Sequence, residues 1–300
     1  MSLVLTVATR RSALALAQAR AWLRTLTEAR PEVTVEELHV TTTGDKIQDR
    51  ALSQIGGKGL FIKEIEEALL DGRARLAVHS MKDLPAELAP GLTVACVPVR
   101  EDPRDALVTR SGGPLTELPE GARVGTSSLR RQVQLARARP DLRFSPLRGN
   151  VDTRLRKCEA GEVDAIVLAA AGLHRLGLAE RISEYLSAEQ VLPAGGQGAL
   201  AIEVSEADEE LRALLAPLQH VETSRRVAAE RGVLRAVEGS CQVPVAAFAE
   251  RVGDALRLRG LLAEPDGSRL RQRELVAPWP ASDEAADALG VKLGEELRAG

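Results

Sequence analysis

The feature that most constrains the fold of this sequence is a regular alternation of short apolar strands with amphipathic helices. Residues 3–8 (LVLTVA) alternate like a strand, and residues 13–29 carry apolar side chains at helical spacing. A second strand is predicted over residues 33–40, a second helix over residues 60–70 and a third strand over residues 74–78. Strands and helices that alternate at this spacing form parallel βαβ units, so this part of the chain predicts an α/β domain.

The same pattern starts again after EDPRDAL at residues 101–107. A strand begins at ARVGTS, and Ser127 or Ser128 is a suitable cap for the helix that follows. The further elements predicted here are a helix over 128–139, a strand over 142–149, a helix over 151–160 and a strand over 163–170. We therefore predict a second α/β unit.

Two segments predict that the chain crosses between these units, and a third region has a different pattern. The crossings are placed at Pro98 with Asp102-Pro103, and in the glycine-rich stretch at residues 192–204. From about residue 220, VPVAAFAE, ALRLRGLLAE and RQRELVA predict antiparallel strands before a last helix. The fold class is thus two doubly wound α/β domains of periplasmic-binding-protein-like plan, joined by two crossings, plus a small α+β C-terminal domain. The predicted domains are 1–99 with 199–217, 100–198 and 218–300.

Composition excludes several classes of protein. The 300 residues are 44% apolar and 28% charged, and no apolar run is long enough to span a membrane. The N-terminal residues lack the pattern of a secretory signal, and three widely spaced cysteines favour a reducing cytoplasm over a disulfide framework. The net charge is only −3 and aromatic residues are 2% of the chain, which argues against a nucleic-acid partner.

Cations and hydroxyls follow most of the predicted parallel strands. Carboxyl ends of parallel strands meet at one edge of a sheet, where ligands bind, and helix N-termini there attract anions. Six of the 40 basic residues are lysine and the rest arginine, whose fork grips carboxylates or phosphates. We therefore predict a cleft between the two α/β domains for a polyanionic ligand, with carboxylates and phosphates equally suitable. The residues concerned are Thr9 to Ser12, residues 41–46, His79 to Asp83, Gly125 to Arg131, Arg148 to Arg156, and Arg175.

Common catalytic motifs do not match. GGKG at residues 56–59 lacks the glycine and hydroxyl residue of a phosphate loop, and GTSSL at residues 125–129 lacks the last glycine of a hydrolase elbow. The four histidines show no metal-ligand spacing, so we predict no metal.

One cysteine differs from the other two. Cys96 lies in the apolar strand LTVACVPV and Cys158 in a charged helix, whereas Cys241 lies in a glycine-bearing loop, EGSCQVPV. A thiol in such a loop can become a thiolate and form a covalent bond if cations lower its pKa. A plain loop cysteine remains the alternative.

Taken together, these residues resemble one family closely, the porphobilinogen deaminases, also called hydroxymethylbilane synthases. The segments that carry the resemblance run in order from residue 10 to residue 244 and are GGKGLFIKEIE, AVHSMKDLP, VGTSSLRRQ, LRGNVDTRL, AAAGLHRLG and EGSCQVPV. The resemblance implies a three-domain transferase of haem and tetrapyrrole biosynthesis. Such an enzyme condenses four porphobilinogen molecules head to tail, releases ammonia, and gives linear hydroxymethylbilane (preuroporphyrinogen).

The resemblance also implies a role for individual residues. Cys241 would hold a dipyrromethane cofactor through a thioether, and Asp83 would be the catalytic carboxylate that stabilises a cationic azafulvene and carries a proton. Its implied cofactor-binding residues are Cys241, Lys82, Ser127, Ser128, Arg130, Arg131 and Arg154. Its implied substrate-binding residues are Arg10, Ser12, Lys58 (on a mobile loop), Arg148, Arg154, Arg175 and Gln197. It further implies a cytoplasmic monomer, with porphobilinogen as its partner, no nucleic acid or membrane, and a product handed to the next enzyme.

Several residues depart from the family pattern. Gln54 replaces a frequent second loop lysine, Gly195 a frequent proline, Val221 a frequent histidine and Ser240 the usual glycine, while Arg11 adds a cation. None of these removes a residue with an implied chemical role. The rival hypotheses are a bilobal anion-binding protein, which would not need Cys241 or Asp83, and a transferase acting on a phosphorylated substrate, which would need metal-binding carboxylates.

Overall fold

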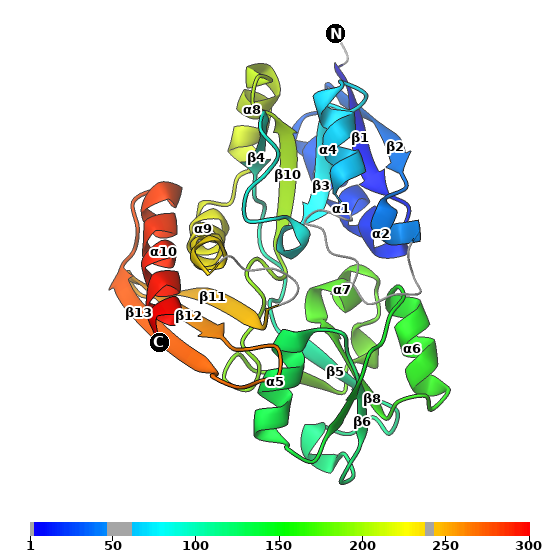
Figure 1. Cartoon of the computed structure of the whole chain (residues 1–300). Coiled ribbons are helices and arrows are strands. Elements are labelled where there is room, and N and C mark those ends of the chain that lie inside the picture. Colours follow the sequence, from blue (N-terminus) through cyan, green and yellow to red (C-terminus); the bar gives the residue numbers. More distant parts are fainter. Residues whose placement is uncertain (1–2, 47–61, 238–242) are drawn as a thin grey trace. The chain divides into compact units, whose positions relative to one another are not determined.

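The computed structural model describes residues 3–46, 62–237 and 243–300 of the chain (Figure 1). The described residues divide into two compact units. Unit 1 contains residues 3–46, 62–100 and 199–224, and unit 2 contains residues 101–198, 225–237 and 243–300. Among the described residues, the chain passes from one unit to the other after Arg100, after Gly198 and after Ser224. The first two passages are the two predicted crossings, and the third lies within the first turn of the helix that begins at Val221. The three domain boundaries set from the sequence stay a prediction.

Unit 1 is built on a five-stranded sheet whose described strands run in the order β2-β1-β3-β10-β4. Its strands are β1 (Leu3–Arg10), β2 (Val33–Val40), β3 (Leu76–Ser80), β4 (Leu92–Cys96) and β10 (Leu200–Ser205). Helices α1 (Ala13–Ala29) and α8 (Glu209–Leu215) pack on one face, and α4 (Lys63–Leu70) packs on the other. Alternate residues of β1 explain this, because Leu5 and Val7 face α1 whereas Ala8 faces α4.

Unit 2 contains a second five-stranded sheet, in the order β7-β6-β8-β5-β9 among the described residues. Its strands are β5 (Asp105–Thr109), β6 (Arg123–Gly125), β7 (Arg143–Ser145), β8 (Ala165–Ala169) and β9 (Glu184–Leu186). Helix α5 (Leu129–Ala138) packs on one face, while α6 (Val151–Glu159) and α7 (Ala170–Arg175) pack on the other. Both sheets therefore have helices on both faces, as predicted for doubly wound α/β domains.

The sheets are mixed and not wholly parallel, which corrects the expectation of parallel βαβ units. Strand β10 runs antiparallel to β3 and β4, and β5 runs antiparallel to β8 and β9. Each of these strands directly follows a crossing. Both strands enter their sheets at the carboxyl edge of the neighbouring strand, because Leu200 at the start of β10 pairs with Ser80, and Asp105 at the start of β5 pairs with Ala169. Each therefore runs antiparallel to that neighbour.

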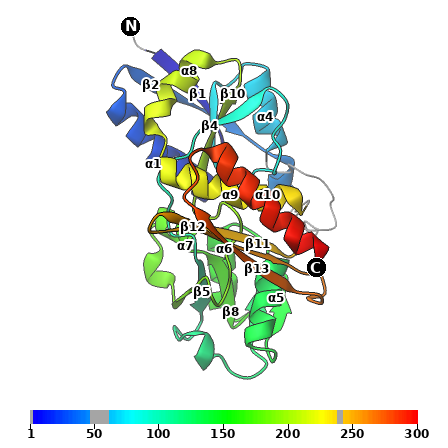
Figure 2. The same cartoon turned by 90° about the vertical axis from the view of Figure 1, so that its left-hand side faces the viewer.

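The rest of unit 2 is the predicted small antiparallel sheet with helices. Its strands are β11 (Val245–Val252), β12 (Ala255–Leu262) and β13 (Arg271–Pro278). Helices α9 (Val221–Ala236) and α10 (Asp283–Ala299) pack on one face of this sheet, and Figure 2 shows α10 running across it. The other face, through Phe248 and Leu261, packs on Leu192 of the second crossing.

Candidate functional site

In unit 1, two neighbouring parallel strands bring predicted site residues to one edge of the sheet. Arg10 is the last residue of β1, and Ser12 caps α1 by accepting a hydrogen bond from the Ala15 amide at 3.3 Å. Strand β3 lies beside β1 and ends at Ser80, two residues later than predicted. The next residues, Met81–Asp83, form a single turn of 3-10 helix in which Lys82 is half-buried and Asp83 is exposed.

These residues enclose a small polar cavity. It has a volume of about 30 Å³ and is lined by Arg10, Gln18, His79, Ser80 and Asp83 together with apolar residues of β3, α1 and α4. The Ser80 hydroxyl donates to the Gln18 Oε1 at 3.0 Å, which fixes the wall of the cavity.

In unit 2, the loop after β7 gathers a second group of predicted residues. The Ser127 hydroxyl donates to the Leu147 carbonyl at 3.1 Å, and the Arg154 Nε donates to the Gly149 carbonyl at 2.8 Å. Arg148 lies between Leu147 and Gly149 in the sequence. Its Nη2 is buried and has no hydrogen-bond partner among the described residues. Gly149 has a φ of +111°, a conformation that glycine adopts readily. A buried guanidinium donor without a partner suits an anionic ligand.

Arg130 and Arg131 take part in a buried network around Asp105. Asp105 is fully buried and accepts hydrogen bonds from both guanidinium groups, at 2.7 Å from Arg130 Nη1 and 2.7 Å from Arg131 Nη2. Burial alone would raise the pKa of the Asp105 carboxyl, but the two arginine charges hold that pKa below its usual range. Burial lowers the pKa of Arg131, and the Asp105 charge opposes that change. These arginines thus have a structural partner that the sequence did not reveal.

Each of these two arginines still has unused donors. Arg130 Nη1 also binds the Leu192 carbonyl at 2.7 Å, and Arg131 Nη1 binds the Val167 carbonyl at 2.9 Å. With the bonds to Asp105, three of the five N–H groups of each guanidinium are engaged with described residues. Ser128 caps the same helix, because its Oγ accepts from the Arg131 amide at 3.4 Å.

Arg175 and Gln197 lie at the second crossing. Arg175 ends α7, and its Nη2 donates to the Gly198 carbonyl at 2.7 Å. Burial lowers the pKa of Arg175, and the nearby Glu101 carboxylate opposes that change. Gln197 is fully buried and donates to the Pro103 carbonyl at 2.8 Å and to Asp105 Oδ1 at 3.0 Å.

Two predicted residues lie outside the part of the chain that the structure describes. They are Lys58 and Cys241, along with the family departures Gln54 and Ser240. Sequence reasoning also missed residues of the site. Asp105 lies in EDPRDAL, read only as a break between units, and Gln18 lies inside the predicted first helix.

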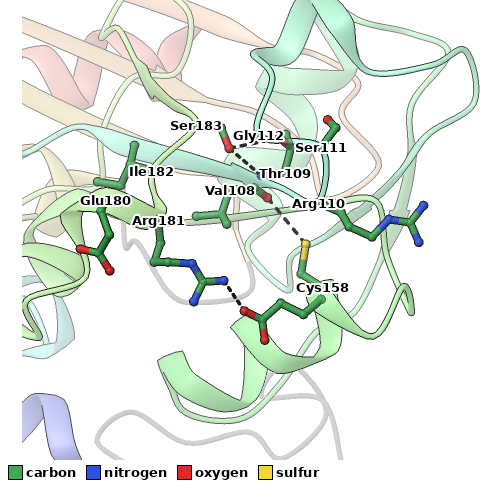
Figure 3. Close-up of a pocket in the computed structure, with 11 residues that line it drawn as sticks. Val108, Thr109, Arg110, Ser111, Gly112, Cys158, Glu180, Arg181, Ile182 and Ser183 are labelled. Atoms are coloured by element: carbon green, nitrogen blue, oxygen red, sulfur yellow. Dashed lines mark hydrogen bonds and ion pairs between the residues drawn. The ribbon is translucent and has the colours of Figure 1, made fainter.

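A larger cavity lies away from all predicted site residues (Figure 3). It has a volume of about 430 Å³, and its lining includes Thr109, Arg110, Cys158, Arg181 and Ser183. Thr109 pairs with Ala165, the first residue of β8, so this cavity lies at the opposite edge of the sheet from Ser127 and Arg148. Cys158 is buried, and burial raises the pKa of its thiol, which disfavours the nucleophilic thiolate.

Two features are absent from the part of the chain that the structure describes. No group of three or more His, Cys, Asp or Glu side chains there could hold a metal ion. No helix in the same part of the chain is long and apolar enough to cross a membrane.

Two family descriptions match almost the whole sequence. "Porphobilinogen deaminase, dipyromethane cofactor binding domain" matches residues 5–213, and "Porphobilinogen deaminase, C-terminal domain" matches residues 224–299. The chain belongs to the porphobilinogen deaminase family. It therefore contains that family's cofactor-binding domain, over the segment that carries Arg10, Asp83 and Arg148.

Known relatives agree with this assignment. The porphobilinogen deaminase of Sorangium cellulosum is 64% identical over 296 residues, which cover 99% of both chains. That of Syntrophotalea carbinolica is 53% identical over 298 residues, covering 99% of this chain and 93% of the relative. Among solved structures, a nutrient-binding protein from Burkholderia cenocepacia bound to methionine aligns with 13% identity and a TM-score of 0.43, over 70% of this chain and 89% of that one. A TM-score below 0.5 does not establish a common fold.

Proposed function

We propose that this porphobilinogen deaminase family member condenses four porphobilinogen molecules head to tail, with release of ammonia, to give linear hydroxymethylbilane. The observation that carries the proposal is the cavity that Arg10 and Asp83 share at the ends of two neighbouring parallel strands. Each porphobilinogen brings two carboxylates and a leaving amine. A cation that binds carboxylates beside an exposed carboxylate is what such a substrate requires.

In this proposal, Asp83 stabilises positive charge on the reacting pyrrole and carries protons. Its carboxylate is exposed at the mouth of the cavity, so it can reach a bound substrate and exchange its proton with water. Arg10 and Lys82 hold substrate carboxylates on either side of it. Ser12 caps α1, so its amide-rich N-terminus adds a further place for an anion.

The residues of unit 2 suit the cofactor that the family binds. A dipyrromethane has four carboxylates, and Arg148 has a buried donor with no partner among the described residues. Arg130 and Arg131 keep unused N–H groups, and Ser127, Ser128, Arg154, Arg175 and Gln197 are the other residues to which we assign anion binding. When bound through a thioether to Cys241, the cofactor would supply the pyrrole to which the first substrate ring is added.

The finer assignments belong to the same proposal. We assign the chain to the cytoplasm as a monomer that passes its product to the next enzyme of tetrapyrrole synthesis. We also propose three domains, residues 1–99 with 199–217, 100–198 and 218–300, with Lys58 contributing from a loop.

Replacing Asp83 by Asn tests the proposed catalytic role. The change keeps the shape and removes the charge, so kcat for ammonia release should fall by roughly 100-fold or more, as for other electrostatic and acid–base groups. Glu87→Gln is the matched control, because Glu87 is a nearby exposed carboxylate outside the cavity. Its kcat should stay within about twofold of the parent. An Asp83→Asn variant with parental kcat would show that the catalytic carboxylate lies elsewhere.

A further inference from the structure

A buried acid–base pair lies directly behind the proposed catalytic turn. His79 in β3 and Glu203 in β10 approach to 2.9 Å between Nε2 and Oε2, with side chains 5% and 0% exposed. His79 pairs across the strands with Ala201, so Glu203 is its diagonal neighbour on the same face of the sheet. Neither side chain is needed for the reaction as described above.

The surroundings of the pair make its charge state important. Both Glu203 carboxylate oxygens lack a well-aligned hydrogen bond among the described residues, although His79 is close enough for an ion pair. Pairing of β10 with β4 shifts register between Ile202 and Glu203, so the strand is irregular at the carboxylate. A carboxylate buried in this way is costly unless a proton or a cation neutralises it. His79 is the basic side chain that the structure places against this carboxylate.

The pair also reaches the catalytic cavity. His79 lines the 30 Å³ cavity together with Arg10, Ser80 and Asp83, and only Ser80 separates it from the Met81–Asp83 turn. The titratable groups near the pair are Asp83 and Arg10, which line the same cavity, and Glu66 on α4. Burial, and secondarily the Glu203 charge, raise the pKa of Glu66.

We propose that His79 and Glu203 act as positioning residues, whose buried pairing holds the end of β3 so that Asp83 faces its substrate. The proposal rests on the assignment of Asp83 as the catalytic carboxylate. Loss of the His79 side chain leaves one uncompensated carboxylate inside the sheet. The strand end then shifts, which lowers kcat more than it weakens binding of substrate carboxylates.

The test is the measurement of kcat and KM for holoenzymes at one pH. His79→Gln leaves Glu203 without its basic partner, so kcat should fall roughly tenfold while KM changes less than about twofold. The double variant His79→Gln/Glu203→Gln has two neutral amides in place of the pair, so no uncompensated charge remains inside the sheet. It should retain kcat within about threefold of the parent.

Two outcomes would overturn the proposal: parental kcat for His79→Gln, or a double variant whose kcat is as low as that of His79→Gln. If His79→Gln does not fold, a double variant with less than about a third of the parental kcat overturns it. Asp83→Asn, measured alongside, separates the two proposals. Full activity of Asp83→Asn would refute the catalytic assignment, whereas a large loss there together with either of the two outcomes above refutes only the positioning role.

Discussion

Among individual residues, the predicted site contains both an exposed carboxylate and a buried one, and the two have different roles. Asp83 is exposed where substrate can reach it, whereas Asp105 is fully buried under two arginines. A buried carboxylate with two guanidinium partners organises the arginines, since removing one member leaves uncompensated charge. Asp105 therefore orients Arg130 and Arg131, whose unused N–H groups remain available for anions.

Replacing Asp105 by Asn should lower the free energy of unfolding by about 3–5 kcal/mol, the usual cost of breaking a buried ion pair. Asp102→Asn is the control, because its partner Arg104 is largely exposed, and it should cost about 1 kcal/mol or less. Urea unfolding measures both.

The difference in stability between the parent and Asp105→Asn should depend on pH. The arginines depress the pKa of Asp105 in the folded state, so its stabilisation is complete above the unfolded pKa of about 3.9 and is lost as the pH falls further. The stability difference between parent and Asp105→Asn should therefore shrink below about pH 4. A difference that is constant from pH 7 to pH 3 would contradict this assignment.

Among helices and strands, the sequence predicted those with a clear apolar periodicity of their own. It missed strands whose place depends on pairing with distant parts of the chain. The helix at residues 13–29, the strand at residues 33–40 and the C-terminal strands are present where predicted. Strand β10 was read as a glycine-rich crossing and β5 as a break, because each takes its direction from a sheet formed by distant residues. For the same reason, the sequence placed His79 after its strand, while pairing with Ala201 extends β3 to Ser80.

Site residues divide in the same way. Motif positions such as Arg10, Ser80 and Asp83 could be placed on one sheet edge from the order of strands alone. Asp105 and Glu203 could not, because their roles depend on partners 26 and 124 positions away along the chain. The anion-binding roles of the arginines stay a prediction.

Helices α9 and α10 give a prediction at the same scale. They approach so closely that a Cβ on Gly290 would overlap the Ala229 carbonyl oxygen. Gly290→Ala should therefore destabilise the protein by about 1–3 kcal/mol, although alanine is the better helix former. Ala288→Gly, on the exposed side of α10, is the control and should cost about 1 kcal/mol from propensity alone. Stabilisation by Gly290→Ala in thermal unfolding would contradict this packing.

At the scale of the whole molecule, buried polar side chains tie the second crossing to both parts of unit 2. The Glu230 carboxylate on α9 accepts the Gly196 amide at 2.6 Å and the Ala249 amide at 2.9 Å. The adjacent Gln197 binds Asp105, which holds Arg130 and Arg131. A continuous set of contacts thus joins the C-terminal sheet to the arginines that we assign to the cofactor. Cys241 lies in the segment of sequence between α9 and this sheet.

We propose that Cys241 carries a covalent dipyrromethane on which four porphobilinogens are assembled. Intact mass spectrometry of the parent, Cys241→Ala and Cys158→Ala, each incubated with porphobilinogen, tests it most directly. Cys158 is the control thiol because it is buried away from the predicted site. We predict an excess of two linked pyrrole units on the parent and on Cys158→Ala, and the plain polypeptide mass for Cys241→Ala. The same excess on Cys241→Ala, or an unmodified parent that releases no ammonia, would contradict the account.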